Sequence, residues 1–384
     1  MTRTARLVAP GLAMIAVSYG LARFGYGLFL PDLREASNLG AAALGLIGAG
    51  SYAGYCLAVV ASLVLSARVG PRFMLVVTGA VAVAGMAMIS LSPAAWVLAV
   101  GVLVAGSSSG LASPPMGEAV ARTVPPDGQD RANALINCGT GVGVALAGPA
   151  ALLVADGWRI AWAGFAAVGL GVLLWNAAAM PGRADKDSEG SEGQAPSLTL
   201  GWLFRRCSLP LFVVAAGVGL GSAAYWTFSR DLVVQAGGMG EFGATVFWAV
   251  IGVSGIAGGM AGDLVGGLGL ARALRYSLGS MAAAIGLLAG APGAPVAAYA
   301  SAALFGSSYI ALTGIVLVWA VSVFHERPSA GLGAAFLILA AGQALGSILA
   351  GTMAEATSPR AAFWFFVGIT LVTALVRPRK TGTQ

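Results

Sequence analysis

The sequence predicts an all-α polytopic membrane protein with twelve transmembrane helices in two pseudo-symmetric six-helix bundles. Of its 384 residues, 58% are hydrophobic and only 9% are charged, and the mean hydropathy is +0.86. A soluble domain is about 25% charged. The apolar residues fall in twelve blocks, most of them long enough to cross a ~30 Å hydrocarbon layer as a helix. This composition excludes an ordinary soluble enzyme, a disordered chain and a nucleic-acid-binding protein.

The apolar blocks are continuous rather than alternating, which favours helices over the strands of a membrane barrel. The last block is the shortest. The expected spans are Leu7–Leu30, Ala43–Ser66, Phe73–Leu91, Ala95–Val120, Ala132–Ala155, Ile160–Met180, Leu209–Ser229, Phe242–Gly262, Ala273–Gly290, Val296–Phe324, Gly331–Ala354 and Ala361–Val376.

One long polar stretch divides the chain. Residues 182–197 are rich in Asp, Glu, Lys, Ser and Gly, a composition that cannot bury a core. We therefore expect a flexible cytoplasmic linker over residues 181–206, between an N-terminal six-helix bundle over residues 1–180 and a C-terminal one over residues 207–384.

The basic residues predict the orientation, because Lys and Arg concentrate on the cytoplasmic side of a membrane. With the N-terminus in the cytoplasm, Arg23 lies within the membrane and 16 of the 21 basic residues fall inside. Only Arg34, Arg159, Arg230 and Arg360 fall outside. We expect a multi-pass protein of the inner membrane with both termini in the cytoplasm.

The two halves of the sequence resemble each other. The spacing of Gly139, Gly143 and Gly148 in the fifth span is repeated 203 positions later by Gly342, Gly346 and Gly351 in the eleventh. Gly106-Ser107-Ser108 of the fourth span is repeated 200 positions later as Gly306-Ser307-Ser308 of the tenth. Matches in several spans, all separated by nearly the same number of residues, indicate a duplicated six-helix unit.

Two segments resemble a known family. The loop Ser66–Arg72, sequence SARVGPR, resembles the Asp-Arg-x-Gly-x-Arg signature of the major facilitator superfamily of transporters, with Ala67 in place of the Asp. The equivalent loop of the second half keeps Asp263 but lacks the following Arg. Residues 19–35, YGLARFGYGLFLPDLRE, resemble the first span of its YbfB/YjiJ-type branch.

The resemblance implies a central cavity lined by spans one, four, seven and ten that opens alternately to either side of the membrane. Gly148-Pro149 also partly resembles the Gly-Pro motif of the antiporter branches, without the glycine pair that should follow.

Arg23 is the one charge deep in a predicted span. An Arg near the bilayer centre costs at least ~2.5–3.5 kcal/mol, so it should face protein or a water-filled cavity. Its guanidinium suits a carboxylate, sulfonate or phosphate of a substrate. The alternative is a structural Arg that is satisfied by helix carbonyls, Asp32 or Asp231.

The expected site is completed by polar and aromatic residues. They lie on the spans that the resemblance assigns to the cavity and on spans five and eleven. The candidate substrate-binding residues are Arg23, Tyr19, Tyr26, Ser107, Asn137, Tyr225, Trp226, Ser307, Tyr309 and Gln343. The candidate gating residues are Arg68, Arg72, Glu118 and Asp263, with Glu118 paired to Arg68 or Arg72 at the inner side.

These features predict a secondary active transporter, not an enzyme, that moves a small organic solute, expected to be an organic anion, by alternating access. Its expected partners are that small-molecule substrate, a candidate coupling proton and the lipid bilayer. We expect a monomer, without cofactor, metal or nucleic acid. The alternatives are an efflux antiporter for a hydrophobic metabolite or drug, and a membrane sensor or lipid-modifying enzyme.

Overall fold

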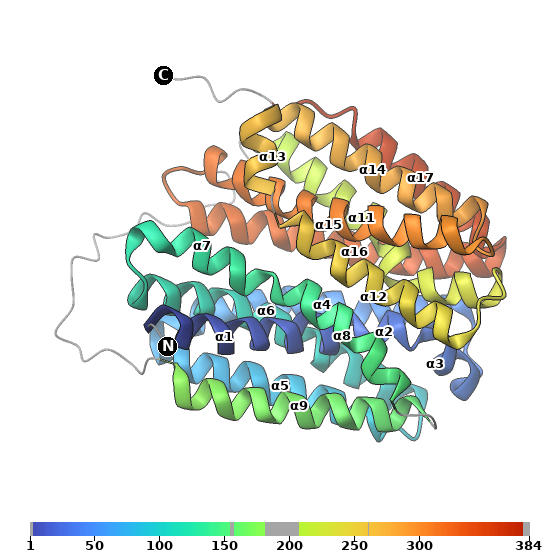
Figure 1. Ribbon diagram of the computed structural model, residues 1–384, viewed down its shortest axis with the longest axis horizontal. Helices are drawn as coiled ribbons and strands as arrows, with labels where there is room; N and C mark the ends of the chain where they lie inside the picture. Colours follow the sequence, from blue (N-terminus) through green and yellow to red (C-terminus); the bar gives the residue numbers. More distant parts are fainter. Residues whose placement is uncertain (1–2, 154–156, 181–206, 260, 379–384) are drawn as a thin grey trace.

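The computed structural model describes residues 3–153, 157–180, 207–259 and 261–378, and within these ranges every regular element is a helix. The predicted linker, residues 181–206, lies outside the described residues. Ten helical segments are long and apolar enough to cross a membrane. The helices run side by side along the long axis of the molecule (Figure 1).

We call the helices of residues 3–180 the N-terminal half. They are α1 (Arg3–Ile15), the π-helix η1 (Ala16–Arg23), α2 (Gly25–Leu28), α3 (Leu30–Ser37), α4 (Ala41–Val69), α5 (Pro71–Ser90), α6 (Ala95–Thr123), α7 (Pro126–Asn137), α8 (Gly139–Leu152) and α9 (Trp158–Ala179).

We call the helices of residues 207–378 the C-terminal half. They are α11 (Leu209–Gln235), α12 (Glu241–Gly258), α13 (Ala261–Leu268), α14 (Leu270–Gly290), α15 (Pro295–Val323), α16 (Pro328–Ala356) and α17 (Pro359–Thr373). The start of α1 and the end of α17 lie at one end of the molecule, the terminal end, and α3 lies at the opposite end, the distal end (Figure 1).

Three predicted spans are interrupted rather than continuous. Residues 7–30 are divided among α1, η1, α2 and the start of α3, and the helix continues to Ser37. The fifth begins earlier than predicted, at Pro126, and changes from α7 to α8 at Cys138. The eighth divides into α12 and α13. The first interruption has a clear cause, because the amide of Phe24 donates to the carbonyl of Tyr19, five residues back, at 2.9 Å. Such a bond widens the turn at this point.

The repeat seen in the sequence is also a repeat of contacts. Gly143 of α8 packs on η1, where an added Cβ would lie 2.2 Å from the carbonyl oxygen of Ala16. Its counterpart Gly346 of α16 packs in the same way on α11, where an added Cβ would lie 2.7 Å from the Cβ of Ala223. Small residues of this kind let membrane helices approach closely.

The two halves exchange equivalent contacts with each other. Gly148 of α8 packs on Thr245 of α12, and its repeat partner Gly351 of α16 packs on Ala41 of α4. The other extensive contacts between the halves join α11 to α2 and α3. The helices α2 and α3 lie toward or at the distal end, and these contacts add to those that α4 and α8 make with α16 and α12 (Figure 1).

We expect Gly143→Ala and Gly346→Ala each to lower the melting temperature of the purified protein in detergent. Overpacking of this kind costs about 1–3 kcal/mol. Gly164→Ala in α9 is the matched control, because an added Cβ there meets nothing within 4 Å. Equal melting temperatures for all three variants would show that these close approaches do not hold the helices together.

Candidate functional site

Arg23 is buried between the two halves. It ends the widened turn of η1, and only 6% of its surface is exposed. Its Nη2 donates to the side-chain Oε1 of Gln343, on α16, at 2.8 Å. This bond joins the N-terminal half to the C-terminal half. Arg23 Nε is buried without a hydrogen-bond partner in the described part of the chain.

Four aromatic rings surround the guanidinium of Arg23. Its Cζ lies 4.3 Å from the ring centre of Tyr55, 5.0 Å from that of Tyr52, 5.4 Å from that of Phe24 and 5.7 Å from that of Tyr19. Each ring face attracts a cation at such distances, and more strongly where water is excluded. The rings lower the free-energy cost of burying the charge but do not neutralise it.

A polar and aromatic chain continues from Gln343 into the C-terminal half. Gln343 Nε2 donates to the hydroxyl of Tyr309, on α15, at 3.0 Å. The Tyr309 ring meets Trp226 of α11 edge-on at 5.3 Å, and Trp226 stacks on Phe24 at 4.0 Å. Residues of η1, α11, α15 and α16 therefore meet around one point.

A small cavity adjoins this point, with room for about one water molecule. Its walls come from both halves of the molecule. The lining residues are Arg23, Phe24, Tyr26, Gly27, Gly48, Ser51, Tyr52, Trp226 and Thr227.

Arg23 forms no ion pair with any described residue. The two carboxylates that could have neutralised it, Asp32 and Asp231, bind other arginines at the distal end. A structural role for Arg23 as the partner of either carboxylate is therefore excluded in this conformation.

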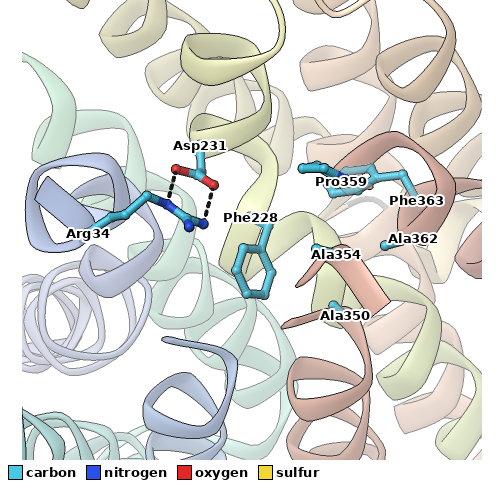
Figure 2. Close-up of a pocket in the computed structure, with 8 residues that line it drawn as sticks. All are labelled: Arg34, Phe228, Asp231, Ala350, Ala354, Pro359, Ala362 and Phe363. Atoms are coloured by element: carbon cyan, nitrogen blue, oxygen red, sulfur yellow. Dashed lines mark hydrogen bonds and ion pairs between the residues drawn. The ribbon is translucent and has the colours of Figure 1, made fainter. Parts of the chain in front are cut away.

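At the distal end, α3 and α11 exchange ion pairs. Arg34 donates to both carboxylate oxygens of Asp231, from Nε at 3.1 Å and from Nη2 at 2.7 Å, as Figure 2 shows. In the opposite direction, Nη1 of Arg230 donates to Asp32 at 2.9 Å. Arg230 is 2% exposed, and it also binds the carbonyl of Leu28 and the carboxylate of Glu241. We call Asp32, Arg34, Arg230 and Asp231 the distal latch.

A further contact between the halves lies at the same end. The Oε2 atom of Glu355, on α16, accepts from the backbone amide of Ala42 at 2.8 Å. The carboxylate thus caps the free amides and the positive dipole of the α4 N-terminus. The distal end is closed by charged contacts between the halves.

The structure brings together six of the ten predicted substrate-binding residues: Arg23, Tyr19, Tyr26, Trp226, Tyr309 and Gln343. The other four lie elsewhere. Ser107 and Ser307 donate to carbonyls of their own helices, and Asn137 is exposed at the end of α7. Tyr225 is buried within the C-terminal half, where it stacks on Phe305 and bonds Ser301.

The sequence analysis missed Tyr52, Tyr55 and Phe24. Tyr52 and Tyr55 lie three residues apart on α4, on one helix face, and this spacing was a usable signal. It was overlooked because polar residues were sought on spans one, four, seven and ten, with Asn137 and Gln343 from spans five and eleven. Phe24 follows Arg23 directly, and only the widened turn of η1 brings both side chains to the site.

Of the candidate gating residues, Arg72, Glu118 and Asp263 have described side chains, and these three do not contact one another in this conformation. Glu118 pairs with Arg122 of its own helix at 2.5 Å. Arg72 and Asp263 are exposed, and the side chain of Arg68 lies outside the described residues.

A bundle of apolar helices with two similar halves, a buried cation between them and one closed end is the architecture of a membrane transporter. The family model described as "Uncharacterised MFS-type transporter YbfB" matches residues 15–377, and the chain therefore belongs to this family of the major facilitator superfamily. No curated protein sequence matches the chain significantly.

Solved transporter structures share the fold. A variant of the nucleoside transporter NupG has a TM-score of 0.79 at 11% identity, with 97% of this chain and 98% of that chain covered. A bacterial homologue of the human lysosomal transporter Spinster, in an inward-facing and unoccupied conformation, has a TM-score of 0.74 at 15% identity, with 98% and 95% covered. At these identities the similarity shows the fold alone.

We expect Asp231→Asn to loosen the distal end. Hydrogen bonds to charged groups contribute about 1.5–3 kcal/mol each, and the substitution weakens two. In a chain whose three cysteines are replaced, a cysteine introduced at Ala354, which lines the same pocket as Asp231 (Figure 2), should react faster with a maleimide once Asp231 is changed.

The reciprocal exchange Arg34→Asp with Asp231→Arg should slow that labelling again. Labelling rates that do not respond to Asp231→Asn would contradict the role of the latch in closing this end.

Proposed function

We propose that the chain is a secondary transporter that moves a small organic anion across the cytoplasmic membrane by alternating access. The observation that carries this proposal is the buried guanidinium of Arg23, which has one neutral acceptor and no carboxylate partner among the described residues. A charge in this position is costly unless something balances it.

An anionic substrate would supply the missing charge. A guanidinium binds carboxylate, sulfonate or phosphate oxygens through charge-assisted hydrogen bonds. The surrounding aromatic rings offer apolar contact to the body of the substrate, as in most small-molecule sites. Tyr26, Trp226 and Tyr309 come from three different helices, so a substrate there would contact both halves.

The proposal requires twelve crossings. Ten helices qualify by their own length and composition. The consecutive elements α1, η1, α2 and α3 supply an eleventh crossing, and α17 supplies the twelfth. An even number places both termini on one side, and the distribution of basic residues assigns that side to the cytoplasm.

With this orientation, the distal latch closes the outer side of the molecule. The cavity would then open toward the cytoplasm, between the terminal ends of the two halves. In the opposite conformation the latch would separate, and Arg68, Arg72, Glu118 and Asp263 would approach one another at the inner side. The two halves would rock about the site in between.

A second candidate function is efflux of a hydrophobic metabolite or drug. It is favoured by the stacked Phe24 and Trp226 rings beside the cavity. In that case Arg23 would be structural, and binding would not depend on its charge.

A thermal-shift screen of the purified protein against organic anions, their neutral analogues and organic cations should separate the two functions. A ligand at 100 times its dissociation constant stabilises by ~2.7 kcal/mol. We expect anions to stabilise the native protein and the control Arg272→Gln, whose side chain is exposed on α14, but not Arg23→Gln. Neutral hydrophobes that stabilise all three proteins equally would instead support efflux.

A further inference from the structure

Both polar atoms of the Gln343 side-chain amide are held by hydrogen bonds. Its side chain is completely buried, its Oε1 accepts from Arg23, and its Nε2 donates to Tyr309. The orientation is unambiguous, because a guanidinium has only donors and must face the amide oxygen. The oxygen of Gln343 therefore occupies one donor position of Arg23, at Nη2, where an anionic oxygen of the substrate could bind.

We propose that Gln343 holds the place of the substrate anion in the empty transporter and is displaced when the substrate binds. This inference rests on the proposed anion site at Arg23. The amide oxygen and a carboxylate oxygen are both sp² acceptors of similar geometry, but only the carboxylate carries a charge. A carboxylate forms the stronger bond to a guanidinium, so it displaces the amide.

The same exchange makes the site selective. A neutral ligand that takes the place of the Gln343 oxygen breaks the Arg23–Gln343 bond and offers only another neutral acceptor. It would gain nothing from the exchange, whereas an anion gains the difference between a neutral and a charge-assisted bond. Every ligand that displaces Gln343 must therefore offset the free energy lost with the Arg23–Gln343 bond, and only an anion forms a bond strong enough to do so.

The bond also connects the halves. Arg23 belongs to η1 of the N-terminal half and Gln343 to α16 of the C-terminal half. In the empty protein this bond joins them at the cavity, and substrate binding would replace it by contacts of the substrate itself. The amide would stay attached to the C-terminal half through Tyr309.

This role predicts opposite effects for two substitutions of one residue. Gln343→Ala removes the competing acceptor. A water molecule that replaces it is easier to displace, so anion affinity should rise about tenfold, the value of one hydrogen bond to a charged group. Gln343→Glu places a permanent carboxylate beside Arg23, which should lower anion affinity by at least that factor. If Gln343 were a substrate ligand or only a support for Arg23, both substitutions would weaken binding.

The test is the dissociation constant of benzoate, an aromatic monoanion, measured by calorimetry on the purified full-length protein. Benzenesulfonate is the second anion, and benzamide is the neutral analogue of benzoate. Thr352→Ala is the control on α16, because Thr352 is exposed and bonds only carbonyls of its own helix. Gln343→Asn, which is one methylene too short to reach both partners, replaces Gln343→Ala if the latter fails to fold.

Tighter benzoate binding by Gln343→Ala or Gln343→Asn, together with weaker binding by Gln343→Glu, supports the proposal. Weaker binding by all of them, with benzoate binding still lost in Arg23→Gln, overturns the role of Gln343 and leaves the anion site intact. If anions still bind to Arg23→Gln, the proposed function is overturned and this inference with it. The same holds if none of the proteins binds an anion.

Discussion

A guanidinium charge inside a membrane must be balanced, and this requirement organises the centre of the molecule. Arg23 is held by a neutral amide and surrounded by Tyr55, Tyr52, Phe24 and Tyr19. These contacts lower the cost of burial without cancelling the charge. The carboxylates that could have cancelled it are engaged at the distal end. The charge therefore remains available to an anion that enters the site.

The site and the distal latch are connected by one interrupted helix. The widened turn of η1 carries Tyr19 and Arg23, and nine and eleven residues after Arg23 the same chain segment carries Asp32 and Arg34. Between them, Gly27 lies so close to α11 that an added Cβ would be 2.0 Å from the carbonyl oxygen of Trp226. A rearrangement at Arg23 is thus well placed to reach the contacts of the distal latch.

Much of this architecture could be predicted from the sequence, because apolar blocks, basic residues and repeated glycines are local signals. Arg23 could be found as the single charge within a span, and Gln343 as a polar residue in another. The interruption at Phe24 could not be found, since residues 7–30 form one largely apolar block in which Arg23 is the only charged residue. The ion pairs of Arg34 and Arg230 also escaped prediction, because they depend on which helix ends meet. Ser107 and Ser307 bond carbonyls of their own helices, because a serine in a helix can satisfy its hydroxyl on its own backbone, and their role in substrate binding stays a prediction.

The central claim is that a substrate anion, and not a protein carboxylate, balances Arg23. The most direct measurement is an experimental structure of the protein with 4-iodobenzoate bound, in which the iodine atom marks the ligand. We expect the carboxylate to lie within hydrogen-bonding distance of Arg23, with the amide of Gln343 turned away from it. A ligand bound elsewhere, with the Arg23–Gln343 bond intact, would contradict the account.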